Sequence, residues 1–136
     1  MATYTRSNAW NNGGTFTNTD LLWYARGVRA MQALPLDNLN SWWSFAALHG
    51  EYITDPSFPG WGHLPSPPAT PTTPQPPQSI QDKYWNQCQH QSWYFLPWHR
   101  GYLIALEAQI RAAVKAAGGP SYHWYFPALK SPDGSE

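Results

Sequence analysis

Five histidines and a single cysteine are the residues of this chain whose types could do chemistry. The histidines occupy positions 49, 63, 90, 99 and 123, and the cysteine is Cys88. A neutral imidazole nitrogen is a good ligand for copper or zinc, and an imidazole at a helix end within aromatic surroundings readily stays neutral. Spacing alone leaves two interpretations open, metal ligation and the commoner one of histidines hydrogen-bonded in the core or at the surface.

Three of the histidines are set apart by their sequence context. His99 lies in the first turn of a predicted helix, and His90 lies nine residues earlier, ahead of the aromatic run Trp93-Tyr-Phe-Leu-Pro-Trp98. His49 closes another predicted helix. His63 instead lies in a Gly- and Pro-rich segment, where a solvated loop histidine is the commoner role. The context therefore favours His49, His90 and His99 as candidate ligands.

A first helix is predicted from Thr19 to Ala33. Apolar residues recur there at three- and four-residue steps, while arginine and glutamine take the other face. Thr19 or Asp20 can cap its start by accepting backbone N–H bonds, and Pro35 cannot continue it because proline lacks the donor. This segment therefore supplies one amphipathic helix upstream of the candidate ligands.

Two further helices are predicted to carry the ligands. One begins at Asn40 or Ser41 and holds His49 near its end, followed by a glycine that is an ambiguous stop. The other begins near Pro97, a residue type suited to the first helical position, and ends at Gly118-Gly-Pro120. The aromatic segment after it is expected to pack in extended form or as a strand. The fold class is therefore mainly α with long irregular loops.

A proline-rich stretch separates the second and third helices. Nine prolines stand between Pro56 and Pro77, which predicts a polyproline-like surface loop at about 55–80 rather than a helix or central strand. Neither flank alone has enough apolar surface to fold, so we interpret the stretch as an insertion within one domain spanning residues 1–136. A recognition segment for an aromatic-groove module is the less common alternative.

Composition excludes several function classes. The eight basic residues balance eight acidic ones, and only 12% of residues are charged, which argues against nucleic-acid partners and a polybasic membrane-surface role. No apolar leader region and no run of about 18 apolar residues is present. We therefore expect a soluble and by default cytoplasmic protein, although a leader removed beforehand, or export by another route, would leave the same sequence.

One cysteine allows no intrachain disulfide.

The segment from Cys88 through His90 and His99 to Glu107 closely resembles the first copper-binding signature of the tyrosinase family. Segments 24–35 and 41–50 resemble the lead-in to the first ligand in that family, so the resemblance covers most of residues 20–127 except the proline-rich loop. It implies that His49, His90 and His99 hold one copper ion. It also implies a fold built on a four-helix bundle, of which this chain carries about half.

The resemblance suggests roles for four further residues. Cys88 stands where some family members join a cysteine to the ligand histidine by a thioether, here His90, and a buried free thiol is the alternative. Glu107 could accept a bond from an imidazole N–H or pair with Arg100 or Arg111, and an exposed helical carboxylate is the equally common alternative. Phe95 suits a wall of the copper pocket, and core packing explains it equally well. His123 falls in an aromatic segment that supports the pocket in the family, so packing is its expected role.

The family's second copper site is missing from these residues. That site normally comes from a later His-x-x-x-His helix with a further histidine, and His63 and His123 lie in the wrong context to replace it. The resemblance therefore implies that the other half of the domain is a separate chain, a proteolytic product or a part lost by truncation. We expect a second polypeptide that carries a second three-His site, so that the complete centre holds two copper ions. An apolar face left uncovered on this chain would favour such a partner.

The resemblance implies copper-dependent oxidation of phenols or catechols to quinones with dioxygen, as a tyrosinase or catechol oxidase. The alternative is a non-catalytic copper-binding or oxygen-binding module, or an inactive fragment. A three-His zinc hydrolase with water in the open fourth position is a third class, which the motif disfavours. No nucleic-acid or membrane partner is expected.

Overall fold

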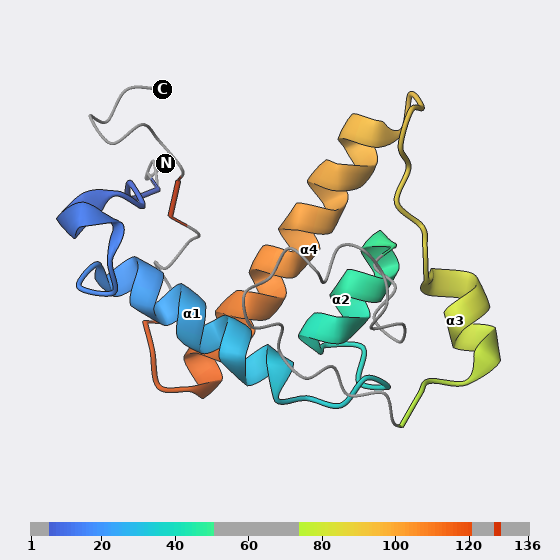
Figure 1. Ribbon diagram of the computed structural model, residues 1–136, viewed down its shortest axis with the longest axis horizontal. Coiled ribbons are helices and arrows are strands. Elements are labelled where there is room, and N and C mark those ends of the chain that lie inside the picture. The colour runs from blue at the N-terminus through green and yellow to red at the C-terminus, as the bar shows by residue number, and fades with distance from the viewer. Residues whose placement is uncertain (1–5, 51–73, 121–126, 129–136) are drawn as a thin grey trace, which may run out of the picture. The chain divides into compact units, whose positions relative to one another are not determined.

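The computed structural model describes residues 6–50, 74–120 and 127–128 (Figure 1). The elements in them are a short 3₁₀ turn, η1 (Asn11–Gly14), and the helices α1 (Thr19–Gln32), α2 (Trp42–His49), α3 (Gln78–Tyr84) and α4 (Phe95–Ala116). An isolated bridge pairs Asn8 with Ala128. The described residues contain no strand. The prediction of a mainly α protein is confirmed. None of the helices in these ranges is long and apolar enough to cross a membrane.

The chain divides into two compact units. The first comprises residues 1–31 and 104–136, so it holds most of α1 and the C-terminal part of α4. The second comprises residues 32–103, so it holds α2, α3 and the start of α4. All three candidate histidine ligands belong to the second unit.

In the first unit, α1 packs closely on α4 through Gly27. A Cβ at this position would lie 2.9 Å from methyl carbons of both Ile110 and Val114, and 3.2 Å from the backbone oxygen of Ile110. Both of these α4 side chains are fully buried. Gly27 is therefore required for the close approach of the two helices rather than for an unusual backbone conformation.

The N-terminal cap of α1 differs from the prediction. Asn18, rather than Thr19 or Asp20, accepts the backbone N–H of Asp20 at 3.0 Å and that of Leu21 at 3.4 Å. Its amide group also donates to the backbone oxygen of Ala9 at 3.2 Å, so this buried side chain holds the preceding segment as well. Asp20 cannot act as the cap because it lies inside the first turn, where its carboxylate accepts the Ser7 hydroxyl.

The second unit has its core around α2. Leu36, Trp43 and Ala47 are buried together, with Trp85 packed against them. Ser41 caps α2, because its hydroxyl oxygen accepts the backbone N–H of Ser44 at 3.0 Å, as one of the two predicted starts requires. The helix ends at a glycine in the left-handed conformation, φ 108°, which resolves the ambiguous stop. His49 is thereby fixed as the last residue of α2.

The long helix α4 begins two residues before Pro97. The backbone N–H of Phe95 donates to the oxygen of Ser92 at 3.1 Å, so the turn forms before the proline is reached. The predicted end is confirmed, since the N–H of Gly118 donates to Lys115 and that of Gly119 to Val114, with Gly118 at φ 82°. His99 therefore lies one turn inside the helix rather than at its first residues.

The short helix α3 was not predicted. It begins at Gln78, immediately after Pro77, so its first residues fall at the end of the stretch assigned to a loop. A proline just before a helix is favourable because the first N–H groups have no intrahelical partner. Most of the insertion predicted at about 55–80 lies outside the described residues, which leave out residues 51–73, and so does the aromatic segment 121–126.

Candidate metal centre

Four side chains bring potential metal-ligating atoms together in the second unit. His49, Cys88, His90 and His99 each offer one such atom, and all four atoms lie within 4.8 Å of one another. His90 is exposed, whereas the other three are partly buried. The three histidines selected from the sequence thus converge, and the cysteine joins them.

The imidazole rings form a nearly equilateral triangle. Ring centroids are 5.9 Å apart for His49 and His90, 5.6 Å for His49 and His99, and 5.6 Å for His90 and His99. Each ring comes from a different segment: the end of α2, the loop before α4, and the first turns of α4. Because no two ligands are neighbours in sequence, the local fold rather than a short motif sets this geometry.

Backbone hydrogen bonds hold the loop segment against the end of α2. The N–H of Asn86 donates to the oxygen of Ala47 at 2.9 Å, and that of Gln87 donates to Leu48 at 3.0 Å. The last carbonyls of a helix lack intrahelical partners, so these bonds satisfy groups that must be satisfied somewhere. They place the following residues, Cys88 and His90, beside His49.

The tautomer of His99 follows from its hydrogen bond. Nδ1 lies 2.7 Å from the backbone oxygen of Phe95. A carbonyl oxygen can only accept, so Nδ1 carries the proton and, in the neutral ring, Nε2 keeps its lone pair. Nε2 is the atom 3.3 Å from Cys88 Sγ, within the cluster. A ligand histidine whose other nitrogen donates to a carbonyl is the usual arrangement at metal sites.

Aromatic side chains of α4 surround His49. The ring centroid of His49 lies 5.5 Å from that of Tyr102 and 6.1 Å from that of Trp98. The Tyr102 and Trp98 rings stack on each other, with their centroids 5.2 Å apart. The Tyr102 hydroxyl donates to the backbone oxygen of Phe45 at 3.1 Å, which joins α4 to α2. The sequence interpretation did not select Trp98 or Tyr102, although their four-residue spacing beside His99 places both on one helix face.

Phe95 and Cys88 both contact the imidazoles. The Phe95 ring centroid is 4.2 Å from that of His99 and 5.8 Å from that of His90. Cys88 Sγ lies 3.3 Å from Nε2 of His90 and equally far from Nε2 of His99. Burial raises the pKa of the Cys88 thiol. The cysteine is free within the described residues.

Glu107 pairs with an arginine that is distant in the sequence. It belongs to the first unit, where its carboxylate accepts two bonds from the Arg6 guanidinium, at 2.5 and 2.7 Å. Sequence reasoning had not selected Arg6 as a partner of Glu107, and the pairing with Arg100 or Arg111 stays a prediction. His63 and His123 lie outside the described residues, so their predicted roles stay predictions.

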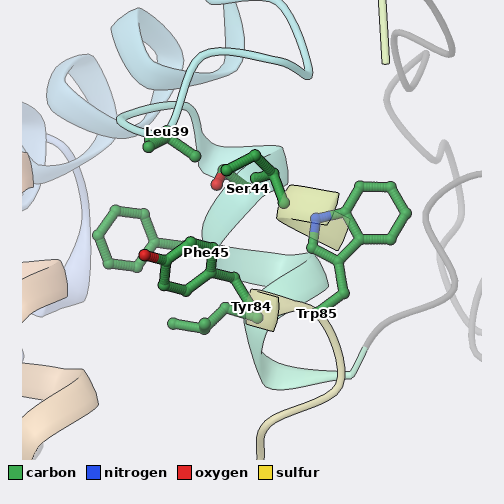
Figure 2. A pocket seen from close by; sticks show the side chains of 7 residues that line it. Leu39, Ser44, Phe45, Tyr84 and Trp85 are labelled. Atoms are coloured by element: carbon green, nitrogen blue, oxygen red, sulfur yellow. The ribbon is translucent and has the colours of Figure 1, made fainter. Parts of the chain in front are cut away.

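A separate apolar pocket lies between α2 and α3. Its volume is about 160 Å³, and Figure 2 shows the rings of Phe45, Tyr84 and Trp85 around it together with Leu39 and Ser44. None of the four potential metal-ligating residues lines it. The pocket therefore belongs to the packing of α3 on α2 rather than to the metal cluster.

The described residues form a helical protein in which three converging imidazoles could hold a metal ion. Residues 39–133 match the family described as "Common central domain of tyrosinase". The chain is also 38% identical over 109 residues to "Tyrosinase HcTyr1" of Hahella sp. (strain CCB-MM4), an alignment that covers 79% of this chain and 22% of that protein. The chain belongs to the tyrosinase family. It spans about a fifth of the length of that curated relative.

Family membership implies copper as the metal. The described cluster fits such an ion, because three imidazoles converge and Nδ1 of His99 is engaged by the Phe95 carbonyl, which leaves Nε2 facing the cluster.

Proposed function

We propose that this chain supplies the first of two copper sites in an enzyme that oxidises phenols or catechols to quinones with dioxygen. The convergence of His49, His90 and His99 carries the proposal, since each comes from a different segment and all three lie within ligand reach of one another. Paired copper ions, when bound, exchange electrons with dioxygen and with the phenolic substrate.

The chain's own residues would orient the ligands and receive the substrate. The Phe95 carbonyl fixes the ring of His99, and Trp98 and Tyr102 frame His49. Phe95 also lines an open depression of about 400 Å³ with Gln91, Ser92 and Trp93. A phenol ring can stack on such aromatic side chains beside the imidazoles, with its hydroxyl toward the ligands.

The second three-His site would come from a polypeptide segment outside these 136 residues. In support, several large apolar side chains near the cluster are exposed: Trp93 by 98%, Leu96 by 74% and Leu103 by 53%. Leu96 and Leu103 are seven residues apart in α4 and so lie on one helix face. A second helical segment that packed there would bring its own histidines close to the first copper site.

An oxygen-uptake assay tests the proposed activity. Catechol oxidation removes two electrons and two protons per molecule, so two catechols are oxidised as one dioxygen becomes two waters. We expect the copper-loaded chain alone to show negligible uptake, and its assembly with a segment carrying the second triad to show catechol-dependent uptake. His90→Ala in that assembly should abolish it, whereas Gln89→Ala should not. An assembly with two copper ions and no uptake would instead support the non-catalytic copper- or oxygen-binding alternative.

We also propose that Cys88 and His90 form a thioether in the mature enzyme. The reaction joins Sγ to a ring carbon of His90, loses the S–H and C–H hydrogens as two protons, and passes two electrons to dioxygen. The short separation of Sγ from the His90 ring supports this. Denaturing intact-mass spectrometry should find the chain two hydrogens lighter and resistant to thiol alkylation. A full-mass, alkylatable chain from active enzyme would contradict the cross-link.

A further inference from the structure

We infer that Cys88, while its thiol is free, is a fourth ligand, so that the chain holds a closed His₃Cys site for a single closed-shell cation, Cu(I) or Zn(II). The inference rests on the proposed function for the three imidazoles and adds the sulfur to them. It concerns the state before any Cys88–His90 cross-link forms.

The separations of the potential metal-ligating atoms support a tetrahedral site. Metal–nitrogen bonds of about 2.0–2.1 Å and a metal–sulfur bond of about 2.3 Å place tetrahedral ligands about 3.3–3.6 Å apart. Cys88 Sγ lies 3.3 Å from Nε2 of His90 and 3.3 Å from Nε2 of His99. The widest separation in the cluster is within 4.8 Å, so closing around an ion requires side-chain movement of about 1 Å.

The chemistry of the four ligands indicates which ions would bind. A thiolate among imidazoles favours the softer ions Cu(I) and Zn(II) over hard cations, and the thiol releases its proton to solvent when it binds. Four protein ligands make a closed site, whereas three leave a position open for a reacting molecule. Cys88 therefore decides between the two kinds of site.

Ligation by Cys88 and its cross-linking exclude each other. A sulfur bonded to a ring carbon of His90 carries no thiolate charge, so it leaves the three imidazoles as the strong ligands. Before cross-linking, the chain would hold one ion tightly in a closed site, and cross-linking would open the fourth position. The competing explanation is a thiol that only hydrogen-bonds to an imidazole nitrogen, which the same distances allow.

Cobalt(II) distinguishes ligation from a hydrogen bond. The reduced 136-residue chain, with its full mass confirmed, is titrated with Co(II) without oxygen. We expect one ion per chain, the visible bands of tetrahedral Co(II), and a near-ultraviolet thiolate-to-cobalt charge-transfer band. Loss of a residue that only supports a metal ligand weakens metal binding roughly 10–100-fold. Loss of a direct ligand should cost at least as much, so we expect Cys88→Ser to weaken Co(II) binding by that factor or more and to remove the charge-transfer band. Gln89→Ala, an exposed neighbour, should keep both.

The possible failures are distinguishable. Binding of one Co(II) by wild type without the charge-transfer band would overturn the Cys88 inference and leave the three-His site standing. No binding by wild type or by Gln89→Ala would contradict the proposed copper site as well.

Stoichiometric Zn(II) and Cu(I) are then tested separately for protection of Cys88 against alkylation. Protection by either ion supports the site and identifies its cation, and protection by neither overturns it. Cys88→Ser should hold both ions more weakly than wild type in competition with a chelator.

Discussion

The Nδ1–H of His99 donates to the backbone oxygen of Phe95, one turn earlier in α4, across 2.7 Å. This bond turns Nε2 of the ring toward His49, His90 and Cys88. The helix that carries the ligand thus also fixes its tautomer and orientation. The Phe95 side chain lies against the same imidazole, so one residue contacts His99 through both its carbonyl and its ring.

Two substitutions separate the ligand role of His99 from its helix contact. An asparagine amide nitrogen can take the place of Nδ1 and keep the bond to Phe95, but it has no counterpart of Nε2. We expect His99→Asn to lose copper while its free energy of unfolding changes by less than about 1 kcal/mol, and His99→Ala to lose copper and about 0.5–1.5 kcal/mol. Metal analysis and denaturant titration of the metal-free chain measure both. Copper retained by His99→Asn would contradict the ligand role.

Gly27→Ala should destabilise the chain. The new methyl group would lie 2.9 Å from side-chain carbons of Ile110 and Val114, which are fully buried and cannot yield freely. Overpacking of this kind costs about 1–3 kcal/mol. Gly101→Ala is the matched control, because it lies in α4 with open space around it, and alanine should stabilise the helix by up to about 1 kcal/mol. Equal effects of the two substitutions in denaturant titrations would argue against close α1–α4 packing at Gly27.

Glu107→Gln tests whether this carboxylate supports the copper site. Its carboxylate pairs with Arg6, which is 45% exposed, so we expect a loss of only about 0.2–1 kcal/mol that shrinks as salt is added. Copper affinity should not change. A tenfold or greater loss of affinity, measured by competition with a chelator, would instead support the orienting role suggested by the sequence.

Alkaline pH should weaken the fold through Tyr24. Burial raises the pKa of its phenol in the folded chain, so the folded state disfavours the phenolate. This part of the stability is complete below the unfolded tyrosine pKa of about 10. It is lost as pH rises from there through the higher folded pKa. The free energy of unfolding of Tyr24→Phe should therefore fall less steeply than that of wild type over this pH range. Parallel curves for the variant and wild type would rule out this contribution.

The sequence predicted the longer helices because each has its own local signals. Ser41 is a cap residue ahead of an apolar segment, and the glycines after Lys115 end α4 as their conformational freedom allows. The short helix α3 has no comparable apolar stripe and directly follows prolines, so its formation depends on packing against α2. Asn18 was missed as a cap because the next two residues are also cap types. Only the tertiary bonds to the preceding segment distinguish it.

The candidate site was predictable in residue identity and not in geometry. The signature around His90 and His99 selected the imidazoles, but it did not indicate that the Phe95 carbonyl would hold His99. Nor did it place Cys88 Sγ equally close to two Nε2 atoms. Both relationships depend on where α4 begins and on the backbone bonds from residues 86 and 87 to α2, which are tertiary features.

The number of copper ions held by the chain tests the central claim most directly. Native mass spectrometry of the copper-loaded 136-residue chain should show one copper per chain. His49→Ala, His90→Ala and His99→Ala should each lose it, while Gln89→Ala keeps it. A wild-type chain without copper at stoichiometric loading, or three histidine variants that still hold one ion, would contradict the assignment of this cluster as the copper site.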